Sequence, residues 1–136
     1  MSYYWDYSSP LGKMTLFSED GRRLFGLWFD GQVYDRRLMP EQDKTEKENL
    51  LVFQKAAEWL DLYFSGKDPG IFPALALTGS EFRRMVSEEM LKIPFGSTTT
   101  YGTIAKQIGA RTGRPKVSAQ AVGGAVGHNP LSVMVP

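Results

Sequence analysis

Hydrophobic and polar residues alternate with a period of two along residues 13–37, a pattern typical of β-strands. Two turn dipeptides, Asp20-Gly21 and Asp30-Gly31, interrupt the alternation, and such dipeptides favour tight hairpins. We therefore predict a three-strand antiparallel meander, to which residues 3–7 can add a further strand. The alternation places Met14 and Leu16 on one face, and it places Leu24, Gly26 and Trp28 on another.

The pattern changes to helical spacing after the charged residues 41–48. We predict a helix over residues 46–64, with Gly66 as its stop, covering one face of the sheet. Residues 65–80 combine several Pro and Gly residues, which predicts an irregular connection between two units. The apolar stripe of the helix is Leu50, Phe53, Ala57, Leu60 and Phe64.

The remaining residues are predicted to be helical. Thr78 and Glu81 have the spacing of a capping box, and an apolar stripe follows them. A short helix is predicted over residues 101–109, closed by Gly109, and another begins near residues 115–118 and ends at 125 or 126. Three helices with a Gly-containing turn between the last two are the plan of a helix-turn-helix domain.

These patterns predict an α+β fold with two domains. Residues 1–76 would form an antiparallel sheet with a helix, and residues 77–136 a helix-turn-helix or winged-helix-like domain. Residues 131–136 have the pattern of an apolar strand that enters a core, whereas chain ends are commonly polar and mobile.

Composition excludes several classes of protein. The 136 residues are 42% hydrophobic, which is enough for a packed core. No run approaches the roughly 18 apolar residues of a membrane span, and the first residues lack a signal-peptide pattern, so we expect a cytoplasmic location without membrane contact. We also expect a monomer. The sequence has no cysteine, and His128 is its one histidine. We therefore expect no disulfide, no metal site and no cofactor.

The positive charge is concentrated in the second half. Residues 1–79 contain 9 Lys and Arg against 12 Asp and Glu, whereas residues 80–136 contain 7 against 3. This imbalance suits polyanion binding, although a solvated basic loop would have the same composition. Residues 94–136 contain no acid, and their four bases are Lys106, Arg111, Arg114 and Lys116.

The last predicted helix contains two adjacent glycines, Gly123 and Gly124. Each costs about 1 kcal/mol relative to Ala inside a helix, so stability alone does not account for them. Small side chains at Ser118, Ala119 and Ala121 would let a partner approach the backbone closely, while Val122 and Ala125 would pack inward. Tight packing against another helix of the same protein is the alternative explanation.

Several segments resemble one family. IPFGSTTTYGTIA and AQAVGGAVGHNPLSVMVP closely resemble the DNA-binding domain of the O6-alkylguanine-DNA alkyltransferases, also called methylated-DNA–protein-cysteine methyltransferases. SPLGKMTL and LDLYFSGK also resemble this family, so the similarity covers nearly the whole chain. The resemblance implies a ribonuclease-H-like scaffold, followed by a domain that binds double-stranded DNA containing alkylated guanine.

The resemblance also implies roles for individual residues. The second helix of the helix-turn-helix would enter the minor groove, and the damaged guanine would be flipped out of the stack. Tyr101 matches a tyrosine that helps the flip, and Asn129 would orient the hinge and the catalytic network; a core aromatic and a turn former are their structural alternatives. The expected DNA-contacting residues are Thr100, Tyr101, Arg111, Lys116, Ser118, Ala119, Gln120, Ala121 and Gly123.

Two departures from the family pattern change the expected chemistry. Many members have an arginine where this chain has Gln120, and that arginine fills the space left by the flipped base. Family members also transfer the alkyl group to a cysteine, activated through a histidine and a glutamate, in a PCHR motif that would begin at Pro136. Because the chain lacks this cysteine, we expect the 136 residues alone to be inactive in transfer.

Two other functions fit parts of the sequence. An alkyltransferase-like lesion-binding protein, in which the cysteine is replaced, would flag damage without transferring the alkyl group. A winged-helix transcription regulator would bind the major groove and recognise a specific sequence. An alkyltransferase or a lesion-binding protein would instead bind the minor groove with little sequence preference. The identity of the residue that follows Pro136 distinguishes the alkyltransferase from the lesion-binding protein.

Overall fold

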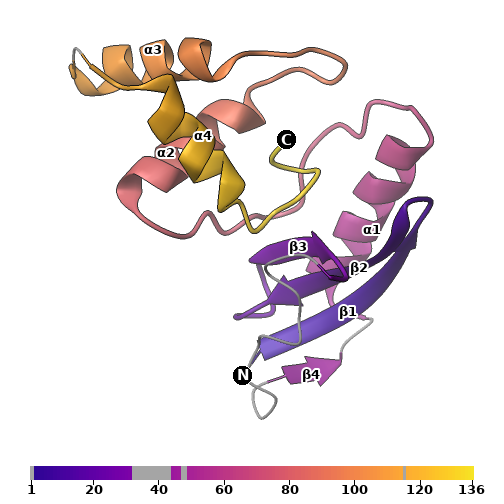
Figure 1. Ribbon diagram of the computed structural model, residues 1–136. Coiled ribbons are helices and arrows are strands. Elements are labelled where there is room, and N and C mark those ends of the chain that lie inside the picture. The colour runs from indigo at the N-terminus through magenta and orange to yellow at the C-terminus, as the bar shows by residue number, and fades with distance from the viewer. Residues whose placement is uncertain (1, 32–43, 47–48, 115) are drawn as a thin grey trace. The chain divides into compact units, whose positions relative to one another are not determined.

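The computed structural model describes residues 2–31, 44–46, 49–114 and 116–136, which form two compact units (Figure 1). The first unit comprises Met1–Ala76 and Pro130–Val133, and the second comprises Leu77–Asn129 and Met134–Pro136. A sheet with one helix forms the first unit and three helices form the second, which confirms the α+β fold class.

The sheet of the first unit has the strand order β3-β2-β1-β4. β1 (Ser2–Ser9) and β2 (Gly12–Ser18) form an antiparallel hairpin, and β2 pairs antiparallel with β3 (Gly26–Phe29). These strands confirm the first two strands of the predicted meander and the added first strand. The last strand of the predicted meander falls in residues 32–43, outside the described residues.

One strand of the sheet was not predicted. β4 (Lys44–Glu46) pairs in parallel with β1, so the sheet is mixed. Its sequence, KTE, carries no apolar alternation because an edge strand can be held by backbone hydrogen bonds and is commonly charged. Residues 44–46 therefore do more than lead into the following helix.

α1 (Leu51–Phe64) lies along one face of the sheet and packs on β1, as predicted (Figure 1). It begins five residues later than predicted, after Leu50, whose side chain makes no capping hydrogen bond. Gly66 adopts a left-handed φ of 80° just beyond its end, which confirms the predicted stop. Phe53 and Leu60 are buried as predicted. The buried face is Val52, Phe53, Ala56, Trp59 and Leu60.

The second unit consists of α2 (Glu81–Leu91), α3 (Tyr101–Thr112) and α4 (Ala119–Gly127), which contact one another pairwise. α2 is capped by Ser80 and not by Thr78, because Gly79 has a φ of 96° that no helical residue adopts. α4 begins after Ser118, within the predicted range. The buried positions of the three helices include Met85, Val86, Met90, Ile104, Ile108 and Val122.

α3 ends at Thr112, with Gly113 as its C-cap, and not at Gly109. Gly113 has the left-handed φ of 72° that closes a helix, whereas Gly109 lies inside the helix. A Cβ at Gly109 would lie 2.9 Å from the carbonyl oxygen of Arg114. This glycine therefore permits a close backbone crossing and does not stop the helix.

The predicted strand over residues 131–136 is wrong in its conformation, although its burial was anticipated. Leu131 forms a single parallel bridge with Leu27 of β3, and a turn follows in which Val133 has a φ of 73°. A left-handed residue cannot continue a strand. Leu131, Met134 and Val135 are nevertheless buried. Pro130–Val133 thus completes the first unit at the outer edge of β3.

Candidate nucleic-acid interface

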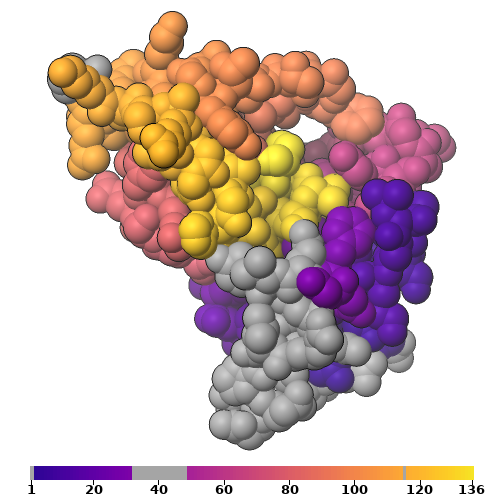
Figure 2. Space-filling view, in the orientation of Figure 1, coloured from indigo at the N-terminus to yellow at the C-terminus, as the bar shows by residue number. Residues whose placement is uncertain are grey.

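α4 presents a surface of small side chains at its N-terminal end. The hydroxyl of Ser118 caps the helix by accepting a hydrogen bond from the N–H of Ala121 at 3.0 Å. Ala119, Gln120 and Ala121 are exposed, while Val122 points inward and is fully buried, as predicted. Side chains that protrude little leave the backbone of this surface open to close approach, and Figure 2 shows α3 and α4 side by side on one face of the second unit.

The two adjacent glycines of α4 have different surroundings. A Cβ at Gly123 would lie 3.2 Å from the Cδ2 and Cε2 atoms of Tyr101, so this glycine makes room for the tyrosine ring. A Cβ at Gly124 would meet no atom within 4 Å, and Gly124 is exposed. Internal packing therefore explains Gly123 but leaves Gly124 without an intramolecular reason.

Tyr101 and Thr100 stand at the start of α3, next to this surface. Thr100 is the N-cap, and its hydroxyl accepts a hydrogen bond from the N–H of Thr103 at 3.0 Å. The Tyr101 side chain rests on α4 at Gly123, yet the residue is 49% exposed. Tyr101 is therefore not a core aromatic, and the structure brings it together with the α4 residues expected to contact DNA.

Arg111 is placed differently from the other bases. Its guanidinium donates to the carboxylate of Glu88 at 2.6 Å and lies 3.6 Å from that of Glu89, so it links α3 to α2. The hydrogen bond to Glu88 raises the pKa of Arg111. Glu89 is buried and also pairs with Lys92 at 2.7 Å. The sequence alone does not indicate these two carboxylate contacts, because the spacing of Glu89 and Lys92 predicts a pair within one helix but no contact with α3.

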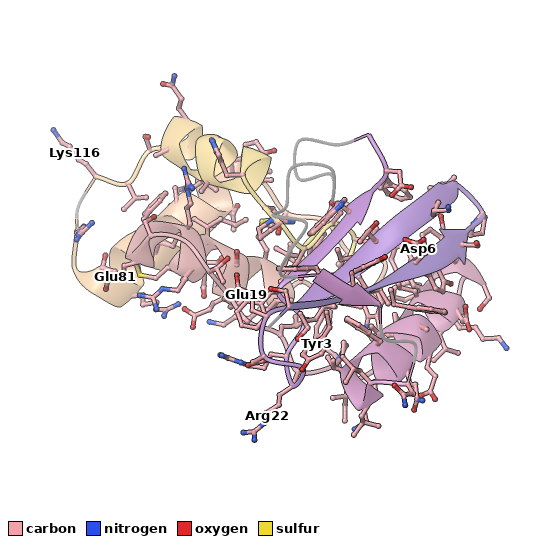
Figure 3. The ribbon with its side chains drawn as sticks, turned by 90° about the horizontal axis from the view of Figure 1, so that it is seen from below. Tyr3, Asp6, Glu19, Arg22, Glu81 and Lys116 are labelled. Carbon is pink, nitrogen blue, oxygen red and sulfur yellow. The ribbon has the colours of Figure 1, made fainter. Side chains whose placement is uncertain are left out.

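Three bases remain available to a partner. Lys106, Arg114 and Lys116 are exposed and form no ion pair with any described residue of the chain. Figure 3 shows Lys116 extending away from the fold into solvent. These cations lie on α3 and on the connection that leads into α4, so they border the small-residue surface.

Asn129 organises the chain after α4. Its amide nitrogen donates to the carbonyl oxygen of Val135 at 2.7 Å, which closes the turn containing Val133. His128, just before it, lies 2.8 Å from the carbonyl oxygen of Gly124 through its Nδ1 atom. Asn129 therefore fixes the backbone of residues that follow it by six positions, a wider role than that of a local turn former.

The described residues offer no group of three or more His, Asp or Glu side chains that could hold a metal ion. None of the helices they form has the length and apolar character needed to cross a membrane. The chain has no cysteine. The surface presents small side chains, one half-exposed tyrosine and several cations. These groups are suited to contact with a polyanion.

Comparison with known families assigns the two parts of the chain separately. Residues 2–77 match the ribonuclease-like domain of 6-O-methylguanine DNA methyltransferase, and residues 81–136 match the DNA binding domain of the same family.

Individual relatives agree with this assignment. Methylated-DNA–protein-cysteine methyltransferase of Mycolicibacterium paratuberculosis is 39% identical, and the match covers 100% of this chain and 76% of that protein. The protein of the same name from Methanosarcina acetivorans is 34% identical over 98% of this chain and 80% of its own length.

Solved structures show the same likeness. The structure of Mycobacterium tuberculosis OGT in complex with DNA has a TM-score of 0.80 and 34% identity, covering 98% of this chain and 74% of that one. The structure of Mycobacterium tuberculosis O6-methylguanine methyltransferase has a TM-score of 0.81 at 34% identity, covering 100% and 76%.

Proposed function

Because the chain belongs to the 6-O-methylguanine DNA methyltransferase family, we propose that it binds duplex DNA through α4 and serves the repair of O6-alkylguanine. The observation that carries this proposal is the exposed N-terminal end of α4, where small side chains adjoin half-exposed Tyr101. The relative solved with DNA supports it. We further propose that residues 1–76 act as a scaffold and residues 77–136 as the DNA-binding domain.

α4 is proposed to enter the minor groove. That groove is only about 6 Å wide, so a helix can approach its floor closely where side chains are small. Exposed Ala119 and Ala121 and the open space at Gly124 meet this requirement. Gln120, exposed on the same turn, would fill the gap left by a flipped guanine and hydrogen bond to the unpaired cytosine.

Tyr101 is proposed to act on the flipped nucleotide. Its ring is held against Gly123, while about half of the residue remains accessible. A phenol in this position can donate a hydrogen bond to the departing guanine. Asn129 would act at a distance from the base, by holding the backbone near Val135 in place.

The transfer step needs a group that this sequence does not contain. In the proposed reaction a thiolate sulfur attacks the alkyl carbon, the bond from that carbon to guanine O6 breaks, and the guanine anion that leaves takes up a proton from solvent. Because the 136 residues contain no cysteine, they cannot form the thioether product. We propose that the acceptor of this reaction is a cysteine directly after Pro136.

A second function, lesion binding without transfer, is compatible with the same DNA-binding surface. Both functions require binding to a duplex that contains O6-methylguanine, and they differ in the residue that follows Pro136. Reading the encoding DNA beyond codon 136 decides between them. A cysteine codon supports the alkyltransferase, and any other residue there supports the lesion-binding protein.

The DNA-binding proposal is tested by fluorescence anisotropy with a labelled duplex, with and without one O6-methylguanine. We expect both duplexes to bind, and a minor-groove ligand to compete while a major-groove ligand does not. Sequence-dependent binding that only the major-groove ligand displaces would overturn the proposal. With a duplex that carries a radiolabel in the O6-methyl group, no radioactivity should remain on the chain after denaturation, and radiolabelled protein would contradict the proposed site of transfer.

Gln120→Arg should tighten binding to both duplexes. The substitution adds a positive charge at an exposed position of α4, where it can reach phosphates and fill the vacated base position. Gln54→Arg, on α1 of the first unit and also exposed, is the matched control for one added charge. Equal affinities for the Gln120→Arg variant and the wild-type chain would argue that α4 does not enter DNA.

A further inference from the structure

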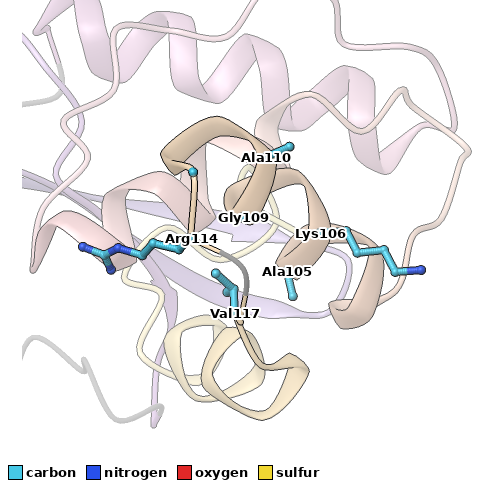
Figure 4. Close-up of a pocket in the computed structure, with 7 residues that line it drawn as sticks. Ala105, Lys106, Gly109, Ala110, Arg114 and Val117 are labelled. Carbon is cyan, nitrogen blue, oxygen red and sulfur yellow. The ribbon is translucent and has the colours of Figure 1, made fainter.

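A shallow depression lies in the second unit where the connection between α3 and α4 passes over α3 (Figure 4). Its volume is about 420 Å³. The residues that line it combine small or apolar side chains with two cations. They include Ala105, Gly109, Ala110 and Val117, together with Lys106 and Arg114.

The floor of the depression is shallow and apolar for a reason visible in α3. Gly109 allows the Arg114 carbonyl to approach within 2.9 Å of where a Cβ would stand, so the connection packs tightly on the helix. Ala105 lies one turn before Gly109 on the same face. The surface beside the connection therefore lacks large side chains.

The cations stand on opposite sides of this floor. Figure 4 shows Lys106 and Arg114 extending in opposite directions, with Ala105 and Val117 between them. Both cations are exposed, neither pairs with an acid among the described residues, and no Asp or Glu lines the depression. Arg111, by contrast, is held by Glu88 and Glu89.

We propose that this depression binds the sugar–phosphate backbone of one strand of duplex DNA, with Lys106 and Arg114 each neutralising a phosphate. The inference rests on the proposed DNA binding by α4 and extends it to a second surface. Each strand of duplex DNA has one phosphate for about every 3.4 Å of helix axis, so two separated cations can contact different phosphates of the same strand. The small floor lets the intervening sugars approach.

The position of the depression along the chain supports DNA, and not an acidic protein, as the molecule that binds there. Arg114 leads through exposed Lys116 to Ser118, the cap of α4, so the depression is continuous with the surface proposed to enter the groove. Contacts to phosphates fix orientation without reading sequence. The depression therefore sets how α4 is aligned on any duplex, damaged or not.

The salt dependence of DNA binding tests this inference on the full 136-residue chain. Anisotropy titrations with an unmodified duplex at several salt concentrations give the slope of log K against log salt. Lys106→Ala and Arg114→Ala should each reduce the magnitude of that slope by about 0.9, the value for one phosphate contact, and the double variant by about twice as much. Lys106→Arg should retain the wild-type slope.

Two further variants distinguish phosphate contacts in the depression from the effect of total charge and test whether the shape of the floor matters. Arg84→Ala removes an exposed cation of α2 outside the depression and should leave the slope unchanged. Ala110→Leu fills the floor without changing charge, and should weaken binding at every salt concentration with the wild-type slope. Thermal unfolding of each variant verifies that the second unit remains folded.

The outcomes distinguish this inference from the proposed function. If the wild-type chain binds DNA and the slope is unchanged by Lys106→Ala and Arg114→Ala, the depression is not a phosphate site while binding by α4 stands. If Arg84→Ala lowers the magnitude of the slope as much as Lys106→Ala and Arg114→Ala do, the slope reports the total charge of the protein and the inference is wrong. If the wild-type chain does not bind duplex DNA, the proposed function itself fails.

Discussion

Gly123 and Gly124 are adjacent in α4 but are required for different reasons. The Tyr101 ring occupies the space beside Gly123, whereas the space beside Gly124 is open. Gly124→Ala should therefore stabilise the second unit by about 1 kcal/mol, because alanine favours the helix and meets no obstacle. Gly123→Ala should gain less or lose stability, since its Cβ would press on the ring. Chemical denaturation measures both.

The same pair separates stability from binding. If DNA approaches α4 at Gly124, Gly124→Ala should weaken DNA affinity even though the protein is more stable. Equal gains in stability for the two variants would show that Tyr101 moves freely away from Gly123. An unchanged DNA affinity for Gly124→Ala would remove the argument that this glycine faces a partner.

Asp20 gives the first unit a measurable acid sensitivity. Its carboxylate accepts hydrogen bonds from the backbone N–H groups of Arg22 and Arg23 and pairs with the Arg23 side chain, and these contacts hold its pKa at about 2. A lowered folded-state pKa contributes stability at neutral pH that is lost as pH falls from about 4 toward 2. Asp20→Asn should flatten the stability profile in that interval.

Unfolding midpoints measured across this pH range verify the prediction. Asp68→Asn is a suitable control, because Asp68 also accepts a backbone hydrogen bond, from Gly70, in an exposed turn. If the wild-type chain and Asp20→Asn lose stability in parallel between pH 4 and 2, the turn at Asp20 does not contribute the expected linkage.

At the scale of single elements, the cap of α4 belongs both to folding and to the proposed interface. Ser118→Ala should destabilise the second unit by about 1 kcal/mol, because the hydrogen bond to the Ala121 N–H is lost. Ser118→Asp keeps a capping oxygen and adds a negative charge. It should therefore retain stability but weaken DNA binding. Retained affinity in Ser118→Asp would show that the cap lies away from the phosphates.

Element boundaries show which signals the sequence contains. The helices of the second unit were predicted from apolar spacing, and the start of α4 was confirmed at Ser118. The end of α3 was misplaced because Gly109 looks like a stop, and only the nearby Arg114 carbonyl shows its real use. The N-terminus of α1 was also misplaced, since Leu50 gives no polar capping signal.

The candidate site was predictable to a similar extent. Resemblance to the family selected Tyr101 and several residues of α4, and the structure places the Tyr101 ring against one of them, Gly123. The pairing of Arg111 with Glu88 could not be predicted, because it depends on how α2 packs on α3. The depression beside Arg114 could not be predicted either, because Lys106 and Arg114, which are eight positions apart, both line it only once the turn between them has folded.

At the scale of the whole molecule, burial of the last residues was predictable from their composition, whereas their destination was not. An apolar run gives no indication of which strand it joins. The backbone of Leu27 donates to the Pro130 carbonyl and accepts from the Ser132 N–H, both at 2.8 Å. Two hydrogen bonds and one buried leucine therefore connect the end of the sequence to β3.

This return of the chain to β3 limits how the protein can be divided. A fragment of residues 1–76 would lack Pro130–Val133 and expose the Leu27 backbone at the edge of the sheet. Exposed edges promote pairing between molecules, so the fragment should self-associate in size-exclusion chromatography with light scattering. A synthetic peptide of residues 129–136, added in trans, should restore the monomer, whereas a scrambled peptide should not. A monomeric, cooperatively folded fragment would instead show that the sheet needs no help from the far end of the sequence.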